Sequence, residues 1–114
     1  MYRIEHYLEP VTQTDVYTNW LGNLRDWQAK VAIVRRLARL ANGHFGDHEF
    51  CRDGVWALRI DSGPGYRIYY AMCGDRLILL LCAGTKRTQQ ADIAIAVQRW
   101  RRYRTRGSDE KQTT

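Results

Sequence analysis

Three strand-like segments follow one another with only short connections between residues 55 and 83. They read VWALRI (55–60), YRIYYAM (66–72) and RLILLLCA (76–83), and the links between them are DSGPG and CGD. Links this short join neighbouring antiparallel strands as hairpins. The apolar run LILLLCA is too short to span a membrane and is typical of a buried central strand. The fold is therefore expected to be built around a small antiparallel sheet.

The turn at residues 61–65 sets the register of the first hairpin. If these five residues form the turn, Ile60 pairs with Tyr66 and Arg59 pairs with Arg67. Side chains alternate along a strand, so one face, the predicted core face, carries Trp56, Leu58, Ile60, Ile68 and Tyr70. The other face, predicted to be at least partly open to solvent, carries Ala57, Arg59, Arg67 and Tyr69.

Helical patterns occur on both sides of the hairpins. A strand is expected over residues 2–8 and a weak helix over 15–24. A stronger helix is expected from the apolar stripe Leu24, Trp27, Val31, Val34, Ala38 and Ala41. A last helix should carry Ile93, Val97 and Trp100. The order is strand, two helices, three strands and a helix, which predicts an α+β domain with its helices on one face of the sheet.

Composition indicates the extent of this domain, its cellular compartment and the charge of its partner. Residues 1–104 are expected to form one domain, and the polar residues 105–114 a disordered tail. Three cysteines without a CxxC pair indicate free thiols in a reducing compartment, and the N-terminus shows no apolar signal segment, so a cytoplasmic location is expected. The 18 basic and 12 acidic residues give a net charge of +6, which favours a polyanionic partner, nucleic acid first.

Two arginines directly opposite each other on neighbouring strands should repel, unless something anionic lies between them. Guanidinium groups bind phosphate bidentately, so Arg59 and Arg67 suit a phosphodiester and the extra charge of its transition state. Lys86 and Arg87 follow the last strand and should add cations at the same edge. The alternative is ordinary surface pairing of Arg59 with Asp61, Asp75 or a C-terminal carboxylate. Both interpretations remain open from the residues alone.

Further candidates surround this pair. Tyr69 can stack on a base or simply pack, and Arg101 lies in the basic run QRWRRYRTR (98–106), a solvated face or a rail for RNA. His44 and His48 flank Asp47 in HFGDH and are candidates for RNA contact. No HExxH frame surrounds these histidines, and no nucleotide-binding glycine motif is present, so no metal or cofactor is expected.

The segments NGHFGD, LRI, GPGYRIYY, LLLCAGTK and QQADIAIA, taken together, resemble the RelE/ParE toxin superfamily and, within it, the HigB-like addiction module killer proteins. The resemblance implies a RelE-like α+β fold and a type II toxin, silenced by a HigA-like antitoxin that carries a helix-turn-helix domain. Operator DNA would then be contacted only through the antitoxin, and no membrane would be involved.

The resemblance also assigns roles to individual residues. Arg67 matches the arginine that stabilises the transition state in RelE-type nucleases, Arg59 stands where these have a strand lysine, and Lys86 where they have a loop arginine. Ala57 replaces a second lysine, and Asp92 stands in place of a catalytic tyrosine. The implied activity is that of a ribosome-dependent mRNA interferase, an endoribonuclease in which the RNA 2′-hydroxyl attacks the adjacent phosphate without a metal.

Two alternatives follow from the same resemblance. ParE-like members share the fold but inhibit DNA gyrase without any catalytic step. A degenerate toxin that retains only antitoxin binding is the other, and the departures at Ala57 and Asp92 favour it. The general base and the codon preference do not follow from the sequence.

Overall fold

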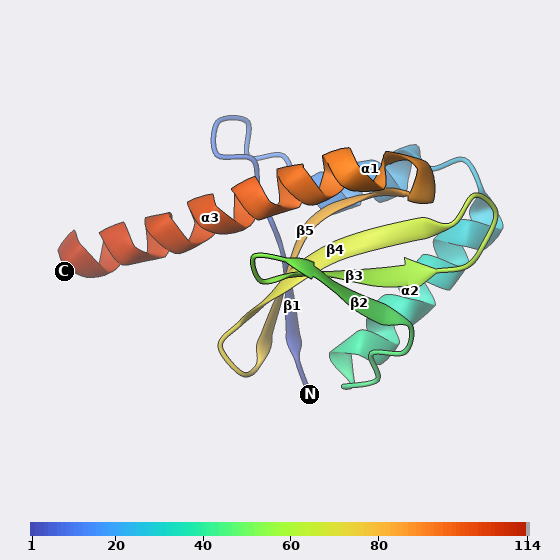
Figure 1. Cartoon of the computed structure of the whole chain (residues 1–114), viewed down its shortest axis with the longest axis horizontal. Helices are drawn as coiled ribbons and strands as arrows, with labels where there is room; N and C mark the ends of the chain where they lie inside the picture. The colour runs from blue at the N-terminus through green and yellow to red at the C-terminus, as the bar shows by residue number, and fades with distance from the viewer. Residues whose placement is uncertain (114) are drawn as a thin grey trace.

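The computed structural model describes the backbone of residues 1–113 and the side chains of residues 1–106. Within these limits the chain forms a five-stranded sheet, three α-helices and one short 3-10 helix (Figure 1). In chain order the elements are β1 (Arg3–His6), α1 (Val16–Asn23), α2 (Trp27–Ala41), β2 (His48–Arg52), β3 (Val55–Ile60), β4 (Tyr66–Cys73), β5 (Leu77–Thr85), η1 (Lys86–Thr88) and α3 (Gln89–Thr113). The α+β class is confirmed, with two helices before the hairpins and one after them.

The strands lie in the order β1-β5-β4-β3-β2. The hairpin strands pair antiparallel as predicted, whereas β1 pairs parallel to β5, with Arg3 opposite Leu77, so the sheet is mixed. Strand β2 is an addition to the predicted order. Its sequence HEFCR is mostly exposed, and it pairs only with β3 at the edge of the sheet. An exposed edge strand lacks the apolar alternation that makes a strand visible in a sequence.

The predicted register of the first hairpin is confirmed. Arg59 pairs with Arg67 and Ile60 pairs with Tyr66. The turn is compact because Gly63 and Gly65 have positive φ angles of 53° and 81°, which a residue with a side chain adopts only under strain. The two arginines therefore project from the same face of neighbouring strands.

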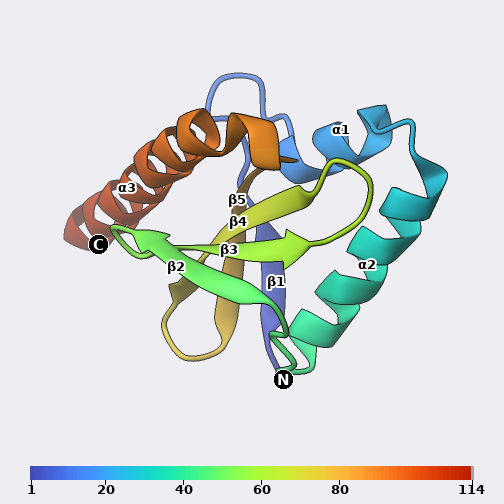
Figure 2. The ribbon, with the colours of Figure 1, turned by 45° about the vertical axis from the view of Figure 1, so that its right-hand side comes forward.

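The helices cover both faces of the sheet, which corrects the prediction that they lie on one face (Figure 2). Helices α1 and α2 pack on the predicted core face, against Leu58, Ile60, Ile68 and Tyr70. Helix α3 covers the opposite face through Ala96, Val97 and Trp100, which bury Ala57, Tyr69, Ala71, Leu79 and Leu81. That second face has its own apolar set, so it needs a cover as much as the first does.

Helix α2 presents a different stripe to the core from the one predicted. Asp26 caps the N-terminus of the helix. The residues that α2 buries are Ala29, Ile33, Leu37 and Leu40. The predicted stripe faces outward, with Trp27 72% and Val34 53% exposed. The prediction was wrong because α2 carries two apolar stripes, about 135° apart at 3.6 residues per turn.

Helix α3 extends to Thr113, past the predicted domain boundary at residue 104. Arginine, glutamate, lysine and glutamine are good helix formers, so the polar sequence of this segment is compatible with a continued helix. Thr114, the end of the predicted tail, lies outside the described residues, and the domain boundary stays a prediction. Within residues 1–113 no helix is both long enough and apolar enough to cross a membrane.

Candidate functional site

The structure brings Arg59, Arg67 and Lys86 together in one hollow at the end of the sheet. We call this hollow the cation groove. Its volume is ≈ 340 Å³, and it is lined by Asp47, Arg59, Asp61, Gly63, Pro64, Gly65, Arg67 and Lys86. The three cations come from β3, β4 and η1, so residues far apart in the chain meet at one edge of the sheet, as the sequence analysis predicted.

The backbone around Gly65 holds the groove together. The Gly65 N–H donates to the Ser62 carbonyl at 2.9 Å, and the Gly65 carbonyl accepts from the Lys86 N–H at 2.9 Å. A Cβ at position 65 would lie 3.5 Å from Cβ of Lys86 and 3.8 Å from Nη1 of Arg67. Both distances are ordinary van der Waals contacts, so the φ of 81° and not a lack of space favours glycine here. The hydrogen bond from the Lys86 N–H to the Gly65 carbonyl sets Lys86 beside Arg67.

Arg59 is already paired with two carboxylates. Its Nε and Nη2 donate to Oδ1 of Asp47 at 2.9 and 2.6 Å, and its Nη1 donates to Oε2 of Glu49 at 2.6 Å. The hydrogen bonds that Arg59 donates to Asp47 raise the pKa of the guanidinium and lower the pKa of the Asp47 carboxyl. Arg59 therefore has internal partners, although they are not the acids that the sequence analysis named.

Arg67 and Lys86 differ from Arg59 in this respect. The one hydrogen bond found for the Arg67 guanidinium runs from Nη1 to the Tyr66 carbonyl at 3.2 Å. Among the side chains of residues 1–106, no carboxylate lies within 4.0 Å of the charged nitrogens of either Arg67 or Lys86. Arg67 is half-buried and Lys86 is exposed, so both can reach an anion that enters the groove.

Arg36 of α2 positions the acidic side of the groove. Its Nη1 donates to the Arg59 carbonyl at 2.6 Å, and its Nη2 donates to the carbonyls of Phe45 and Asp47, each at 3.2 Å. The guanidinium thereby ties the loop before β2 to the end of β3. The helical periodicity of the sequence contains no sign of this bridge.

Tyr69 lies under the groove rather than in it. It is on the same face as Arg67, as predicted, but α3 covers it and leaves it 0% exposed. Its hydroxyl has no hydrogen-bond partner among the described residues, and burial raises its pKa well above the ordinary value. A base cannot stack on this ring unless α3 moves away.

Asp92 serves the start of α3. It lies in the first helical turn and accepts a hydrogen bond from the Thr88 hydroxyl. A carboxylate near a helix N-terminus is favourable, because the unpaired N–H groups there carry partial positive charge. Its carboxylate also fills the space beside Gly84, where any Cβ would collide with it. Asp92 therefore has a local structural function.

The remaining predicted residues lie elsewhere. His48 pairs with Leu58 and is on the α2 face, where its ring stacks on Trp56 and its Nδ1 lies 3.2 Å from the Tyr70 hydroxyl. His44 is exposed in the turn after α2, outside the set that lines the groove.

Arg87 is exposed beside Lys86, in a shallow hollow at the start of α3. Arg101 lies 3.8 Å from Asp53, in the turn at the opposite end of β3 from Arg59. Strand β3 is six residues long, so its two ends lie roughly 17 Å apart. Arg101 is therefore remote from the groove, whereas Arg87 is a neighbour of it.

The charges of the groove are balanced. Arg59, Arg67 and Lys86 face three carboxylates, those of Asp47, Asp61 and Glu49. Two of these acids are bound to Arg59, so the unpaired positive charge is concentrated on Arg67 and Lys86. Such a pair can hold the oxygens of one phosphodiester. No three His, Cys, Asp or Glu side chains in the described part of the chain are grouped to hold a metal ion.

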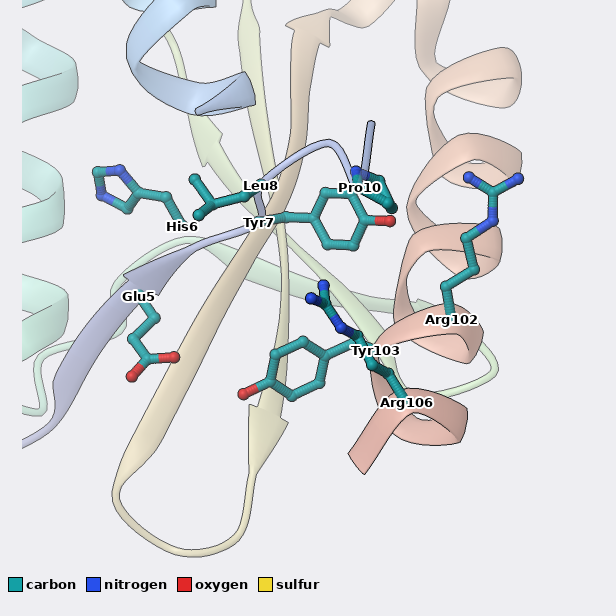
Figure 3. A pocket seen from close by; sticks show the side chains of 8 residues that line it. All are labelled: Glu5, His6, Tyr7, Leu8, Pro10, Arg102, Tyr103 and Arg106. Atoms are coloured by element: carbon teal, nitrogen blue, oxygen red, sulfur yellow. The ribbon is translucent and has the colours of Figure 1, made fainter. Parts of the chain in front are cut away.

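A second hollow, of ≈ 180 Å³, lies between the end of β1 and α3 (Figure 3). The Tyr7 ring extends into this space from the segment that follows β1, and Arg102 and Tyr103 line it from α3. The guanidinium of Arg99 lies 5.5 Å from the centre of the Tyr7 ring. None of the residues predicted from the sequence as site residues lines this hollow, which leaves the cation groove as the candidate site.

Comparison with known proteins assigns the chain to a family. Residues 19–101, which include every element from the end of α1 to the middle of α3, match the family described as Phage derived protein Gp49-like (DUF891). An uncharacterized protein of Haemophilus influenzae (strain Rd) is 42% identical over 83 residues, which is 73% of this chain and 84% of that protein. The chain belongs to the Gp49-like phage-derived family, a RelE-like family associated with toxin–antitoxin systems.

Proposed function

We propose that this protein is the HigB-like toxin of a type II toxin–antitoxin pair and that it cleaves mRNA on the ribosome. The observation that carries the proposal is the pair Arg67 and Lys86, held side by side in the cation groove without a carboxylate partner among the described side chains. The family's association with toxin–antitoxin systems supports the toxin and implies an antitoxin partner. A HigA-like antitoxin, contact with operator DNA through it and a cytoplasmic location are parts of the proposal.

In the proposed reaction the 2′-oxygen of the RNA attacks the adjacent phosphorus and its proton passes to water, while the bond from phosphorus to the 5′-oxygen breaks. The 5′-oxygen takes up a proton from water, so the products are a 2′,3′-cyclic phosphate and a 5′-hydroxyl. Arg67 holds the non-bridging oxygens, whose negative charge grows in the transition state. The Lys86 ammonium lies beside it and stabilises the leaving oxygen.

The charge balance of the groove supports dependence on the ribosome. Affinity for free RNA grows with the number of phosphates that lysine and arginine neutralise. Here Asp47 and Glu49 already neutralise Arg59, so the groove has few charges left with which to bind a free strand. An mRNA that the ribosome already holds needs only to be positioned, and positioning alone supplies a large part of a rate enhancement.

The test is a short induction of the protein in bacterial cells, followed by mapping of mRNA 5′ ends. Cuts within translated frames are expected with the wild-type protein and not with Arg67→Ala. Arg101→Ala is the matched control, because it removes the same charge at the far end of β3 and should leave the cuts in place. Equal cutting by wild type and Arg67→Ala would refute the assignment of the groove.

A ParE-like gyrase inhibitor and a degenerate toxin that retains only antitoxin binding are the other candidates, and two positions speak against a nuclease and keep the degenerate toxin open. Ala57 is buried under α3, and Asp92 is held by Thr88. The two positions at which the resemblance expects a catalytic lysine and tyrosine thus offer no such side chain to the groove. The gyrase inhibitor predicts growth arrest with a DNA damage response and intact mRNA. The absence of any arrest would indicate a toxin that retains only antitoxin binding.

A further inference from the structure

The outer face of α2 carries an apolar seam that the rest of the described chain covers only in part, since Val31 and Ala41 are half-buried. Trp27 is 72% exposed and Val34 53% exposed, and Ala38 is also exposed. The inner face of the same helix is completely used, since Ile33 and Leu40 are each 0% exposed in the core. Helix α2 lies at the edge of the molecule in Figure 2, and the exposure of Trp27, Val34 and Ala38 shows that this part of the seam is accessible.

The spacing of the seam is that of a coiled coil. Trp27, Val31, Val34, Ala38 and Ala41 follow one another at steps of four, three, four and three residues. This repeat of 3.5 residues keeps one line of side chains facing a partner helix along the whole length of α2. A helix that only had to cover its own sheet would need the inner stripe alone.

The rims of the seam are basic. In the heptad that the seam defines, Lys30 and Arg35 occupy the flanking positions that pair with charges on a partner helix, and Arg39 lies next to them. The helix WQAKVAIVRRLARLA contains no acidic residue. A second copy of α2 would place like charges along both rims, which disfavours self-association through this face. A helix with carboxylates along its rims would complement it.

We propose that the α2 seam is a docking surface for an acidic amphipathic helix of a partner protein. The partner that the family implies is the antitoxin, and the inference rests on that association rather than on any nuclease activity. The seam and the cation groove are joined through Arg36, which lies on α2 and binds the carbonyls of Arg59 and Asp47. A helix docked on α2 therefore lies on the element that positions the acidic side of the groove.

The experiment uses a synthetic helical peptide of about three heptads with leucine at the inward positions and glutamate at both rims. Its binding to the purified protein is followed by calorimetry and by the fluorescence of the exposed Trp27. The wild-type protein should bind it, and Val34→Glu should bind about tenfold more weakly or worse, because it places a buried carboxylate against an acidic partner. Val11→Glu is the matched control, since Val11 is an 88% exposed valine outside α2.

A second peptide with lysine in place of the rim glutamates separates charge recognition from non-specific hydrophobic contact. It should bind about tenfold more weakly than the acidic peptide, or worse. The proposal is overturned if the acidic peptide does not bind, if Val34→Glu binds it as well as Val11→Glu does, or if the lysine peptide binds equally well. Self-association of the protein that Val34→Glu abolishes would also overturn it, because the occupant would then be a second copy.

Discussion

The orientation of α2 can be tested with two neighbouring substitutions, Ile33→Ala and Val34→Ala. Ile33 is 0% exposed in the core beneath α2, whereas Val34 is 53% exposed on the seam. The change at Ile33 removes three buried carbon groups at about 0.8 kcal/mol each, or about 2.4 kcal/mol. The cavity that remains raises the loss to about 3 kcal/mol, less a few tenths regained from the better helix propensity of alanine.

The change at Val34 should cost much less. It removes two carbon groups that are only about half covered, worth about 0.8 kcal/mol, and alanine returns about 0.5 kcal/mol of helix propensity. The free energy of unfolding should therefore change by less than about 0.5 kcal/mol. In urea, with a slope of about 2 kcal/mol per molar, the midpoint of Ile33→Ala should fall by about 1.5 M and that of Val34→Ala should barely move.

Circular dichroism against urea concentration measures both midpoints, and equal slopes show that the unfolded states are comparable. Equal losses, or a larger loss for Val34→Ala, would refute the orientation. That result would mean that the seam faces the sheet, as the sequence analysis predicted, and the docking proposal would then lose its surface.

Three further predictions concern the groove and the core. Gly65→Ala should lower the free energy of unfolding by about 1–2 kcal/mol, because φ at this position is 81°. Gly22→Ala should raise the free energy of unfolding by up to about 1 kcal/mol, because Gly22 lies in α1 with open space around it. Urea midpoints measure both changes. Burial raises the pKa of the Cys82 thiol to about 11, so iodoacetamide at pH 8 should label it only after unfolding, as mass spectrometry will show. Because hydrogen bonds from Arg59 lower the pKa of Asp47, this carboxylate stabilises the fold above its ordinary pKa and loses that effect as the pH falls through the lowered one. Asp47→Asn should therefore be less stable than wild type at neutral pH, and the two should converge in acid, as thermal unfolding at a series of pH values will show.

The hairpin was predictable because its information is local. The turn at residues 61–65 fixes the register, and the apolar residues on each side of it sort to one face only in that register. The pairing of Arg59 with Arg67 and the nearby position of Lys86 followed from this arithmetic together with the short link after β5. The resemblance added the chemistry that these three residues are proposed to perform.

The features of the fold that were not predicted depend on contacts between residues far apart in the chain. Strand β1 pairs in parallel with β5 across most of the sequence, and no local pattern indicates a parallel partner. The two apolar stripes of α2 have equally good helical spacing, so periodicity could not show which one faces the core. Tyr69 was placed on the correct face but considered exposed, because the cover that α3 provides comes from residues 96–100.

The same reasoning explains why the acids of the groove were missed. Asp47 and Glu49 come from the loop before β2 and from β2 itself, the strand that the sequence did not reveal. Only once β2 is placed beside β3 do these carboxylates reach Arg59. The sequence analysis singled out the two histidines of HFGDH, but its aspartate is the member that lies in the groove, while His48 turns to the opposite face.

The fold by itself does not distinguish an mRNA nuclease from a gyrase inhibitor, because both activities occur on RelE-like folds. Substitution of the individual cations can distinguish them. An inhibitor that works by binding alone gains from every surface charge, whereas a nuclease needs particular charges free at the reacting phosphate. Here two carboxylates occupy Arg59 and leave Arg67 and Lys86 unpaired among the described side chains, although all three lie in one groove. For this reason Arg67→Ala tests the nuclease more sharply than Arg59→Ala does. A nuclease should stop cutting mRNA when Arg67 is replaced and should keep a measurable part of its cutting when Arg59 is replaced. A binding inhibitor should be weakened to a similar degree by either change.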